Sequence, residues 1–360
     1  MRPTHPPIPV TILSGFLGAG KTTLLNQLVS QPELADALVI INEFGEIPLD
    51  HMLVAHSTEN LVMEMSSGCL CCNIRGDLVK TLRDITWRFS RQGQRQFQRV
   101  LIETTGLADP ASIVHTLMTH PQVADRYRLD GIVTVLDMAT GQHSLDHHSE
   151  AVKQAAMADC LLLAKPDLTT AEQRTDLYRR LDGINPAAPR WEIDHGHIDA
   201  AKLLDLGPFS TEGKVPNVAQ WLNEEAYTKQ ATHHHEAHGH DHDHSDHDVN
   251  RHDDHIKAFC FAIDTPIPED RLTAWLDELT EFLGNDILRV KGILNVKGRE
   301  QPLAIHGVQH VFHPPTPLPV WPSDDRRSRL VFITRDIDRE VVENTLQSLH
   351  RPLPNVRDEP

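Results

Sequence analysis

The sequence contains no long hydrophobic run, and no stretch approaches the about eighteen apolar residues that a membrane-spanning helix needs. Its first residues, MRPTHPPIP, also lack the apolar core of a secretory signal peptide. Basic residues are scarce, because 34 Lys and Arg stand against 51 Asp and Glu and give a net charge of −17. A chain this acidic is a poor ligand for nucleic acid or an anionic membrane. We therefore expect a cytoplasmic protein with neither kind of partner.

Cysteine is also rare, since the 360 residues include five. Three of them fall within Cys69-Leu70-Cys71-Cys72, a spacing that does not suit a disulfide framework. In a reducing compartment such a cluster is better explained as thiolate metal ligands. Cys160 and Cys260 lie in apolar stretches and are expected in the core.

Residues 1–205 alternate short apolar runs with helical patterns. Near-continuous apolar runs are typical of strands buried on both faces. Strands are predicted at 10–13, 38–41, 100–102, 131–136 and 160–163, and helices at 21–30, 76–90, 110–119, 148–158 and 171–182. Asp109 before Pro110, and Thr170 with Glu172, are suitable helix starts. The alternation predicts an α/β domain with a doubly wound, mostly parallel sheet.

The pattern changes in residues 206–255, which we expect to form a linker. Residues 232–255 hold ten His, six Asp and Glu236 with almost nothing apolar, so they offer no face to bury. A smaller α+β domain is predicted for 256–352. Its expected strands are 257–263, 287–296, 303–312 and 328–334, and its expected helices are 268–283 and 338–350. His306, His310 and His313 are expected on its surface.

The segment GFLGAGKT, residues 15–22, matches the phosphate-binding pattern G-x-x-x-x-G-K-[ST] between a predicted strand and a predicted helix. Glycines allow a tight turn that presents backbone N–H groups to phosphate oxygens, and the helix N-terminus adds its dipole. Lys21 is expected to reach the β- and γ-phosphates, and the Thr22 hydroxyl to bind Mg²⁺. The nucleotide-binding residues predicted here are Gly15, Gly18, Ala19, Gly20, Lys21, Thr22 and Thr23.

A second magnesium ligand is predicted at the end of the strand VLIETTG, where Glu103 reaches the carboxyl edge of the sheet. Gly106 leaves a backbone N–H available for a γ-phosphate. We assign Lys21 and Glu103 as the catalytic residues, because phosphoryl transfer needs positioning and charge neutralisation. Since no Gln or Arg finger is evident, intrinsic turnover is expected to be slow.

The run Ala164-Lys165-Pro166-Asp167 follows a predicted strand where many GTPases carry Asn-Lys-x-Asp. Asp167 can accept hydrogen bonds from guanine N1–H and its amino group, and Lys165 would lie along the base. Ala164 cannot make the asparagine contact, a loss of about 1 kcal/mol that weakens the guanine preference without reversing it.

The cysteine cluster precedes a predicted helix, and a bend at Gly68 can bring two sulfurs to one ion. Glu46 of the NEFGE segment is a plausible oxygen ligand. The candidate ligands are Glu46, Cys69, Cys71 and Cys72, with Zn²⁺ favoured over Co²⁺. An incomplete protein shell would leave the ion exchangeable, as a delivery protein requires.

The histidine tract offers many imidazole pairs for a divalent ion, each weak because ordering the chain costs entropy. Its candidate ligands are His233, His234, His235, His238, His240, His242 and His244. Two interpretations stay open: a metal reservoir feeding Cys71, or a solvated linker that binds metals incidentally.

Together, GFLGAGKTT, INEFGE, SSGCLCCNIRGDL, ETTGLADP and the GVQ at 307–309 resemble the CobW-type P-loop GTPases over nearly the whole chain. The resemblance implies a SIMIBI-like GTPase domain with an internal metal site, followed by a C-terminal α+β domain. It also implies that Cys71 is a metal ligand, with Glu46 and His120 as companions. The family is associated with metal insertion, including zinc chaperones and cobalt proteins of cobalamin synthesis.

We therefore expect a GTPase metallochaperone that uses GTP and Mg²⁺ and hands Zn²⁺ to a client metalloprotein. Mg²⁺-GTP would order residues 42–46 and 103–109 and complete the metal site, and a metal- or nucleotide-dependent homodimer would be compatible with this scheme. The alternatives are cobalt delivery or metalloenzyme activation, passive zinc storage in the histidine tract, and a small-molecule kinase. No Arg-rich lid segment supports the kinase.

Overall fold

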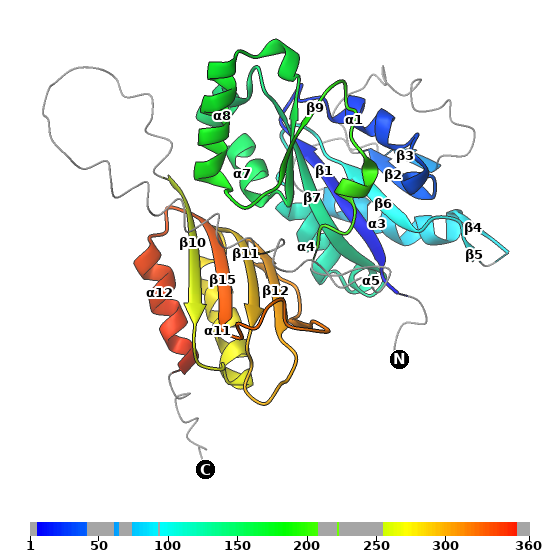
Figure 1. Cartoon of the computed structure of the whole chain (residues 1–360). Helices are drawn as coiled ribbons and strands as arrows, with labels where there is room; N and C mark the ends of the chain where they lie inside the picture. Colours follow the sequence, from blue (N-terminus) through cyan, green and yellow to red (C-terminus); the bar gives the residue numbers. More distant parts are fainter. Residues whose placement is uncertain are drawn as a thin grey trace, which may run out of the picture. The chain divides into compact units, whose positions relative to one another are not determined.

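The computed structural model describes residues 6–41, 61–64, 74–92, 94–207, 222 and 255–350. The chain divides into two compact units, Met1–Pro216 and Asn217–Pro360, which are treated separately below (Figure 1). No helix in the described ranges is long and apolar enough to cross a membrane.

The first unit is built on a seven-stranded sheet whose neighbouring strands are all parallel, in the order β3-β2-β6-β1-β7-β8-β9 (Figure 1). The five central strands are buried along nearly their whole length, as strands covered on both faces must be. The strands are β1 (Ile8–Gly15), β2 (Ala37–Ile41), β3 (Leu61–Glu64), β6 (Arg99–Glu103), β7 (Tyr127–Asp137), β8 (Cys160–Ala164) and β9 (Arg190–Ile193). The parallel α/β sheet expected from the sequence is confirmed.

Helices cover both faces of this sheet. Val133 and Val135 pack in one core cluster with Leu24 of α1, whereas Thr134, on the opposite face of β7, donates its hydroxyl to the Gln154 carbonyl of α7 at 2.9 Å. The helices are α1 (Lys21–Leu28), α3 (Ile74–Arg88), α4 (Ala111–Thr119), α5 (Pro121–Ala124), α6 (Gly141–His147), α7 (Ser149–Met157) and α8 (Ala171–Ile184). Short 3₁₀ turns are η1 (Pro32–Leu34), η2 (Pro166–Leu168) and η3 (Ala200–Leu203), and a small hairpin joins β4 (Ser90–Arg91) to β5 (Gln94–Arg95).

The two expected helix starts are found with small changes. Helix α4 begins at Ala111 with Pro110 in the N-cap position, one residue later than expected, and Asp109 Oδ1 accepts the Ala111 N–H at 2.9 Å. Thr170 begins α8 with a capping box whose partner is Gln173 rather than Glu172. The box needs a side chain three residues after the cap, and Glu172 stands one residue too early.

The second unit is an antiparallel sheet in the order β10-β15-β11-β12-β13, with β14 also paired to β12. Its strands are β10 (Ile256–Ile263), β11 (Ile287–Leu294), β12 (Leu303–Val308), β13 (Val311–Phe312), β14 (Thr316–Pro317) and β15 (Ser328–Arg335). Helices α11 (Glu269–Leu283) and α12 (Arg339–Gln347) pack their apolar faces on this sheet, and η5 (Ser348–His350) follows α12. Trp275, Leu279 and Phe332 lie at the centre of that core. The separate α+β domain is confirmed.

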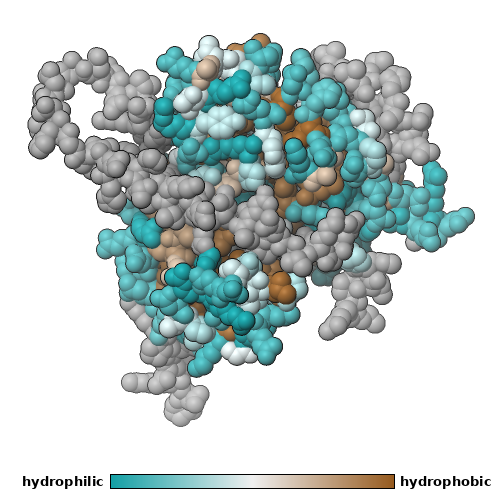
Figure 2. Space-filling model, viewed as in Figure 1, coloured by the Kyte–Doolittle hydropathy of each residue, from teal (hydrophilic) through white to brown (hydrophobic). Residues whose placement is uncertain are grey.

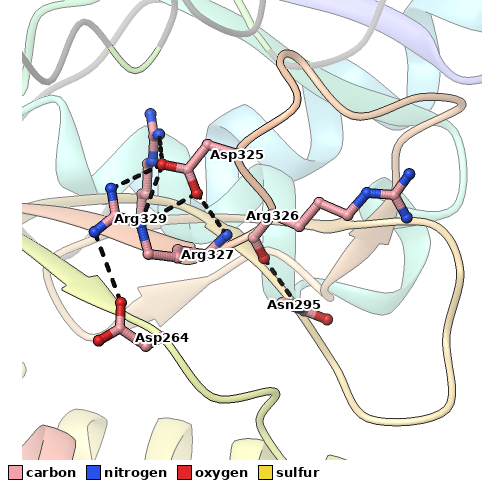
Figure 3. Close-up of polar contacts among 6 residues, drawn as sticks. All are labelled: Asp264, Asn295, Asp325, Arg326, Arg327 and Arg329. Atoms are coloured by element: carbon pink, nitrogen blue, oxygen red, sulfur yellow. Dashed lines mark hydrogen bonds and ion pairs between the residues drawn. The ribbon is translucent and has the colours of Figure 1, made fainter.

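A charged cluster fixes the segment that enters β15 (Figure 3). Arg327 and Arg329 both donate to the Asp325 carboxylate, with 2.8 Å between Arg327 Nη2 and Asp325 Oδ2. These hydrogen bonds, first from Arg327 and then from Arg329, hold the pKa of Asp325 well below its usual range. Arg327 also reaches Asp264 at 3.6 Å, while the Asn295 amide donates to the Arg326 carbonyl at 2.8 Å.

Three expectations for the second unit are wrong. The single strand expected at 303–312 is two, because Gln309 adopts a positive φ of 51° and turns β12 into β13. His306 is buried at 4% exposure rather than lying on the surface, and His310 and His313 are only partly exposed. Cys260 is only partly buried, whereas Cys160 in the first unit is fully buried as expected.

His306 lies on the sheet face opposite the one that packs against α11 and α12, because Ile305, its neighbour on β12, belongs to that apolar core. Lys291 is its cross-strand partner in the β11–β12 register, and Arg289 follows the same alternation along β11. Arg289 and Lys291 are 2% and 9% exposed, so basic groups surround the imidazole away from water. Among the coloured residues on the face drawn in Figure 2, hydrophilic ones predominate, with smaller hydrophobic patches between them.

Candidate nucleotide and metal site

The glycine-rich loop joins β1 to α1, as expected. Gly15, Gly18 and Gly20 have φ values of +144°, +73° and +99°, which favour glycine. A Cβ at Gly15 would lie 2.4 Å from the Val135 carbonyl oxygen, so this glycine also permits close contact with β7. The loop ends at the N-terminus of α1, where the first-turn N–H groups lack helical acceptors and suit an anion.

Lys21, the first residue of α1, folds back over this loop. Its Nζ donates to the Gly15 carbonyl at 2.9 Å and to the Phe16 carbonyl at 3.2 Å, and the residue is 9% exposed. Ala19 is buried beneath the loop, whereas Thr23 is exposed on the first turn of α1. The loop carbonyls therefore hold the ammonium group in place, where it adds positive charge to the anion-binding turn.

Thr22 and Glu103 meet across 81 residues of sequence. The Thr22 hydroxyl donates to Glu103 Oε1 at 2.9 Å, and Glu103 is 4% exposed at the end of β6. The parallel register of β1 and β6, which pairs Leu13 with Glu103, places this carboxylate under the loop. A hydroxyl and a carboxylate oxygen form the hard donor set that Mg²⁺ prefers, so the residues present fit that ion.

Gly106 lies directly against the phosphate-binding loop. A Cβ at this position would be 2.6 Å from the Leu17 nitrogen and 2.7 Å from its Cα. Gln154 of α7 fixes the turn, because its Nε2 donates to the carbonyls of Gly106 at 3.1 Å and Ala108 at 3.0 Å. Gln154 is 1% exposed, and sequence reasoning missed it because a lone helical glutamine carries no motif.

The loop after β8 also reaches the phosphate-binding loop. Lys165, at a φ of +59°, donates its Nζ to the Gly18 carbonyl at 2.9 Å and to Asp137 Oδ2 at 2.6 Å. Asp167 is exposed in η2, one residue beyond Pro166. The sequence analysis missed Asp137, although its position at the carboxyl end of β7 was an available signal.

The expected metal ligands are only partly within the described ranges. Glu46, Cys69, Cys71 and Cys72 lie outside them, as does the histidine tract with His233, His234, His235, His238, His240, His242 and His244. His120 is described: it stands between α4 and α5, and its Nδ1 accepts the Gln122 N–H at 3.3 Å. No cluster of three or more His, Cys, Asp or Glu suited to a metal occurs among the described residues.

A glycine-rich turn between the first strand and helix, with a buried acid on the next parallel strand, defines a P-loop nucleotide-binding domain. Residues 9–192 match the family described as CobW/HypB/UreG, nucleotide-binding domain. Residues 256–350 match the cobalamin synthesis protein cobW C-terminal domain. The chain belongs to the CobW family of P-loop GTPases.

Individual relatives cover almost the full chain. The chain is 30% identical to the zinc chaperone YjiA of Escherichia coli, over 96% of this chain and 99% of that protein. It is 30% identical to the zinc chaperone CobW of Pseudomonas aeruginosa, over 95% and 91% respectively. The crystal structure of Zn(II)-bound YjiA GTPase from E. coli is similar at a TM-score of 0.65 and 26% identity, covering 96% of this chain and 100% of that one.

Proposed function

We propose that this protein is a zinc-binding GTPase metallochaperone that couples GTP binding and hydrolysis to the transfer of Zn²⁺ to a client protein. The observation that carries the proposal is the Thr22–Glu103 contact of 2.9 Å beside the glycine-rich loop. This contact would supply two oxygen ligands for a nucleotide-bound magnesium ion. The relatives that match the chain over almost its full length are named zinc chaperones. Those relatives support zinc as the cargo.

The phosphate chemistry follows from the positions of the loop residues. Backbone N–H groups from Gly15 to Thr22 would surround the β-phosphate, and Lys21 would neutralise charge on the β- and γ-phosphates. Gly106, in contact with Leu17, is placed to offer its N–H to the γ-phosphate. Mg²⁺ held by Thr22 and Glu103 would neutralise the charge that develops on the phosphate oxygens.

Guanine selection is proposed for Asp167, which can accept hydrogen bonds from N1–H and the 2-amino group. The Lys165–Gly18 contact brings the base loop to the phosphate loop, which supports this placement. Asp167→Asn should lower GTP affinity about tenfold or more, because an amide offers one acceptor oxygen where the base presents two donors. The same variant should bind xanthosine triphosphate better than wild type does, since xanthine accepts at C2. Unchanged GTP affinity would remove Asp167 from the base site.

For the cargo site we propose Cys71 with Glu46, His120 and a second thiolate from Cys69 or Cys72. Thiolate and imidazole ligands suit Zn²⁺ and also bind Co²⁺, so cobalt delivery is the nearest alternative. The histidine tract would add weak sites that raise the local zinc concentration. Reciprocal coupling is required: GTP must tighten zinc binding by the factor by which zinc tightens GTP binding.

The decisive experiment is a competitive Zn²⁺ titration of a variant lacking residues 232–255, with and without Mg²⁺ and a non-hydrolysable GTP analogue. We expect one retained site whose affinity rises about tenfold or more with the nucleotide. Equal affinity in both states would reject the coupled mechanism. Loss of nearly all zinc on deletion would instead establish storage in the tract.

Cys71→Ser provides the matched control in that deleted background. It should abolish the nucleotide-dependent tightening while GTP binding without zinc stays intact, since the phosphate loop is untouched. Retained coupling would show that another group binds the ion. Repeating the titration with Co²⁺ shows whether the nucleotide also tightens cobalt binding at this site.

Three further assignments belong to the same proposal. The client is a metalloprotein that accepts the ion. The cytoplasm is the expected compartment, because the Cys69–Cys72 cluster would stay reduced there. A homodimer that depends on metal or nucleotide is compatible with this scheme, and light scattering in each ligand state would detect it.

A further inference from the structure

Helix α6 is tied to the nucleotide site at both of its ends. Before it, Asp137 accepts the N–H groups of Ala139 at 2.8 Å and Thr140 at 3.3 Å, and the other oxygen of its carboxylate binds Lys165. After it, the ring of His148 stacks on the ring of Phe16 in the phosphate-binding loop, with centroids 4.5 Å apart and an interplanar angle of 25°.

Two exposed histidines occupy successive turns on one face of this helix. His143 and His147 are four residues apart, and their rings stack with centroids 4.1 Å apart and an interplanar angle of 29°. Side chains at i and i+4 are neighbours on a helix surface, and two imidazoles at this spacing can chelate one metal ion. The two rings therefore already lie side by side on the helix surface before any ion binds.

The hydrogen bonding of His147 also favours metal binding. Its Nδ1 is 2.9 Å from the backbone carbonyl oxygen of His143. Because a carbonyl only accepts, Nδ1 carries the proton and the lone pair remains on Nε2. Metal-binding histidines commonly have this arrangement, in which a backbone carbonyl fixes the tautomer and the ring orientation.

The neighbouring acid does not complete the ligand set. Asp146 is engaged by the Gln142 amide, at 3.2 and 3.3 Å, and by Arg180 Nε at 3.5 Å. Two imidazoles therefore face solvent together, and water or an incoming ligand would complete the coordination. Imidazole favours Zn²⁺ and similar transition metals over Mg²⁺.

We propose that His143 and His147 form a bidentate, exchangeable Zn²⁺ site on α6, beside the nucleotide-binding loop. It shares no residue with the Cys71 site or the histidine tract and does not depend on the proposed chaperone function. Two open coordination positions would let it receive the ion from another ligand or pass it on.

The test is histidine footprinting of the full chain with diethyl pyrocarbonate, read by peptide mass spectrometry at free Zn²⁺ levels set by a metal buffer. Each histidine is then reported separately, so binding by the tract does not obscure α6. In wild type, His143 and His147 should be protected together at one free Zn²⁺ concentration, while exposed His195 stays reactive. Mg²⁺ at the same concentration should protect neither residue.

The single variants test chelation. In His143→Ala, protection of His147 should need about tenfold more free Zn²⁺, and the reciprocal shift should occur for His143 in His147→Ala. Alanine suits an exposed helix position, so both variants should fold. Protection of His147 at an unchanged Zn²⁺ concentration in His143→Ala, or no protection of either residue in wild type, would overturn the proposal. Neither outcome bears on coupling at Cys71, which the deletion variant measures separately.

Discussion

The buried imidazole of His306 should make the C-terminal domain lose stability as the pH falls. Arg289 Nη2 lies 3.4 Å from His306 Nε2, and because a guanidinium only donates, this nitrogen must be an unprotonated acceptor. Burial first, then the charges of Arg289, His313 and Lys291, lower the pKa of His306 well below its ordinary value. Its neighbour His313 stacks on it with ring centroids 5.6 Å apart.

The direction and size of the effect follow from proton linkage. Below about pH 6.5 the unfolded chain binds a proton at His306 and the folded domain does not, so acid favours unfolding. The stabilisation is fully present above about pH 6.5 and is lost as the pH falls toward the lowered folded pKa. For a single such group, moving from pH 7.5 to 5.5 costs about 1.4 kcal/mol of unfolding free energy.

Urea unfolding at the two pH values would measure this slope. Five tryptophans are present in the chain, so 5-fluorotryptophan labelling with ¹⁹F detection is needed to isolate buried Trp275 in the C-terminal core. His306→Gln should reduce the pH-dependent loss by about 1.4 kcal/mol relative to wild type, because glutamine does not titrate. His350→Gln, at an exposed position of the same domain, should keep the wild-type slope. Identical slopes for wild type and His306→Gln would refute the argument.

Three other predictions concern packing and the nucleotide loop. Gly106→Ala would place a methyl group 2.6 Å from the Leu17 nitrogen, so fluorescence titration should show GTP affinity about tenfold lower while circular dichroism shows an intact fold. Asp137→Asn removes the 2.6 Å ion pair with half-buried Lys165, so the unfolding free energy of the first domain, measured in urea, should fall by about 0.5–1 kcal/mol. A loss above about 3 kcal/mol would mean that the Asp137 carboxylate stabilises the domain through other contacts as well. Trp275→Ala, at a position 1% exposed, should destabilise the C-terminal domain by about 3–5 kcal/mol and leave GTP binding unchanged.

Central strands were predictable because burial on both faces demands consecutive apolar residues. Strand β8, Cys160–Ala164, is such a run, whereas β9 carries Arg190 and Glu192 in an edge position and was missed. The burial of His306 could not be predicted, because alternating residues along a strand do not show whether the second face of the sheet is buried or exposed. Local sequence therefore identified the elements better than their surroundings.

The same distinction applies to the nucleotide site. The residues of the glycine-rich loop are contiguous, so the sequence of residues 15–22 predicts both the turn and the groups expected to bind phosphate. Asp137 binds Lys165, which is 28 positions away in the sequence. Gln154 donates to the Gly106 carbonyl, which is 48 positions away. Such contacts depend on the position of β7 among the strands of the sheet, which no local sequence pattern specifies. These supporting residues hold the loops that we propose bind the nucleotide, so substitutions there should alter nucleotide affinity without changing a motif residue. The pairing of Thr22 with Glu103 was predictable only because the parallel sheet brings strand ends to one edge.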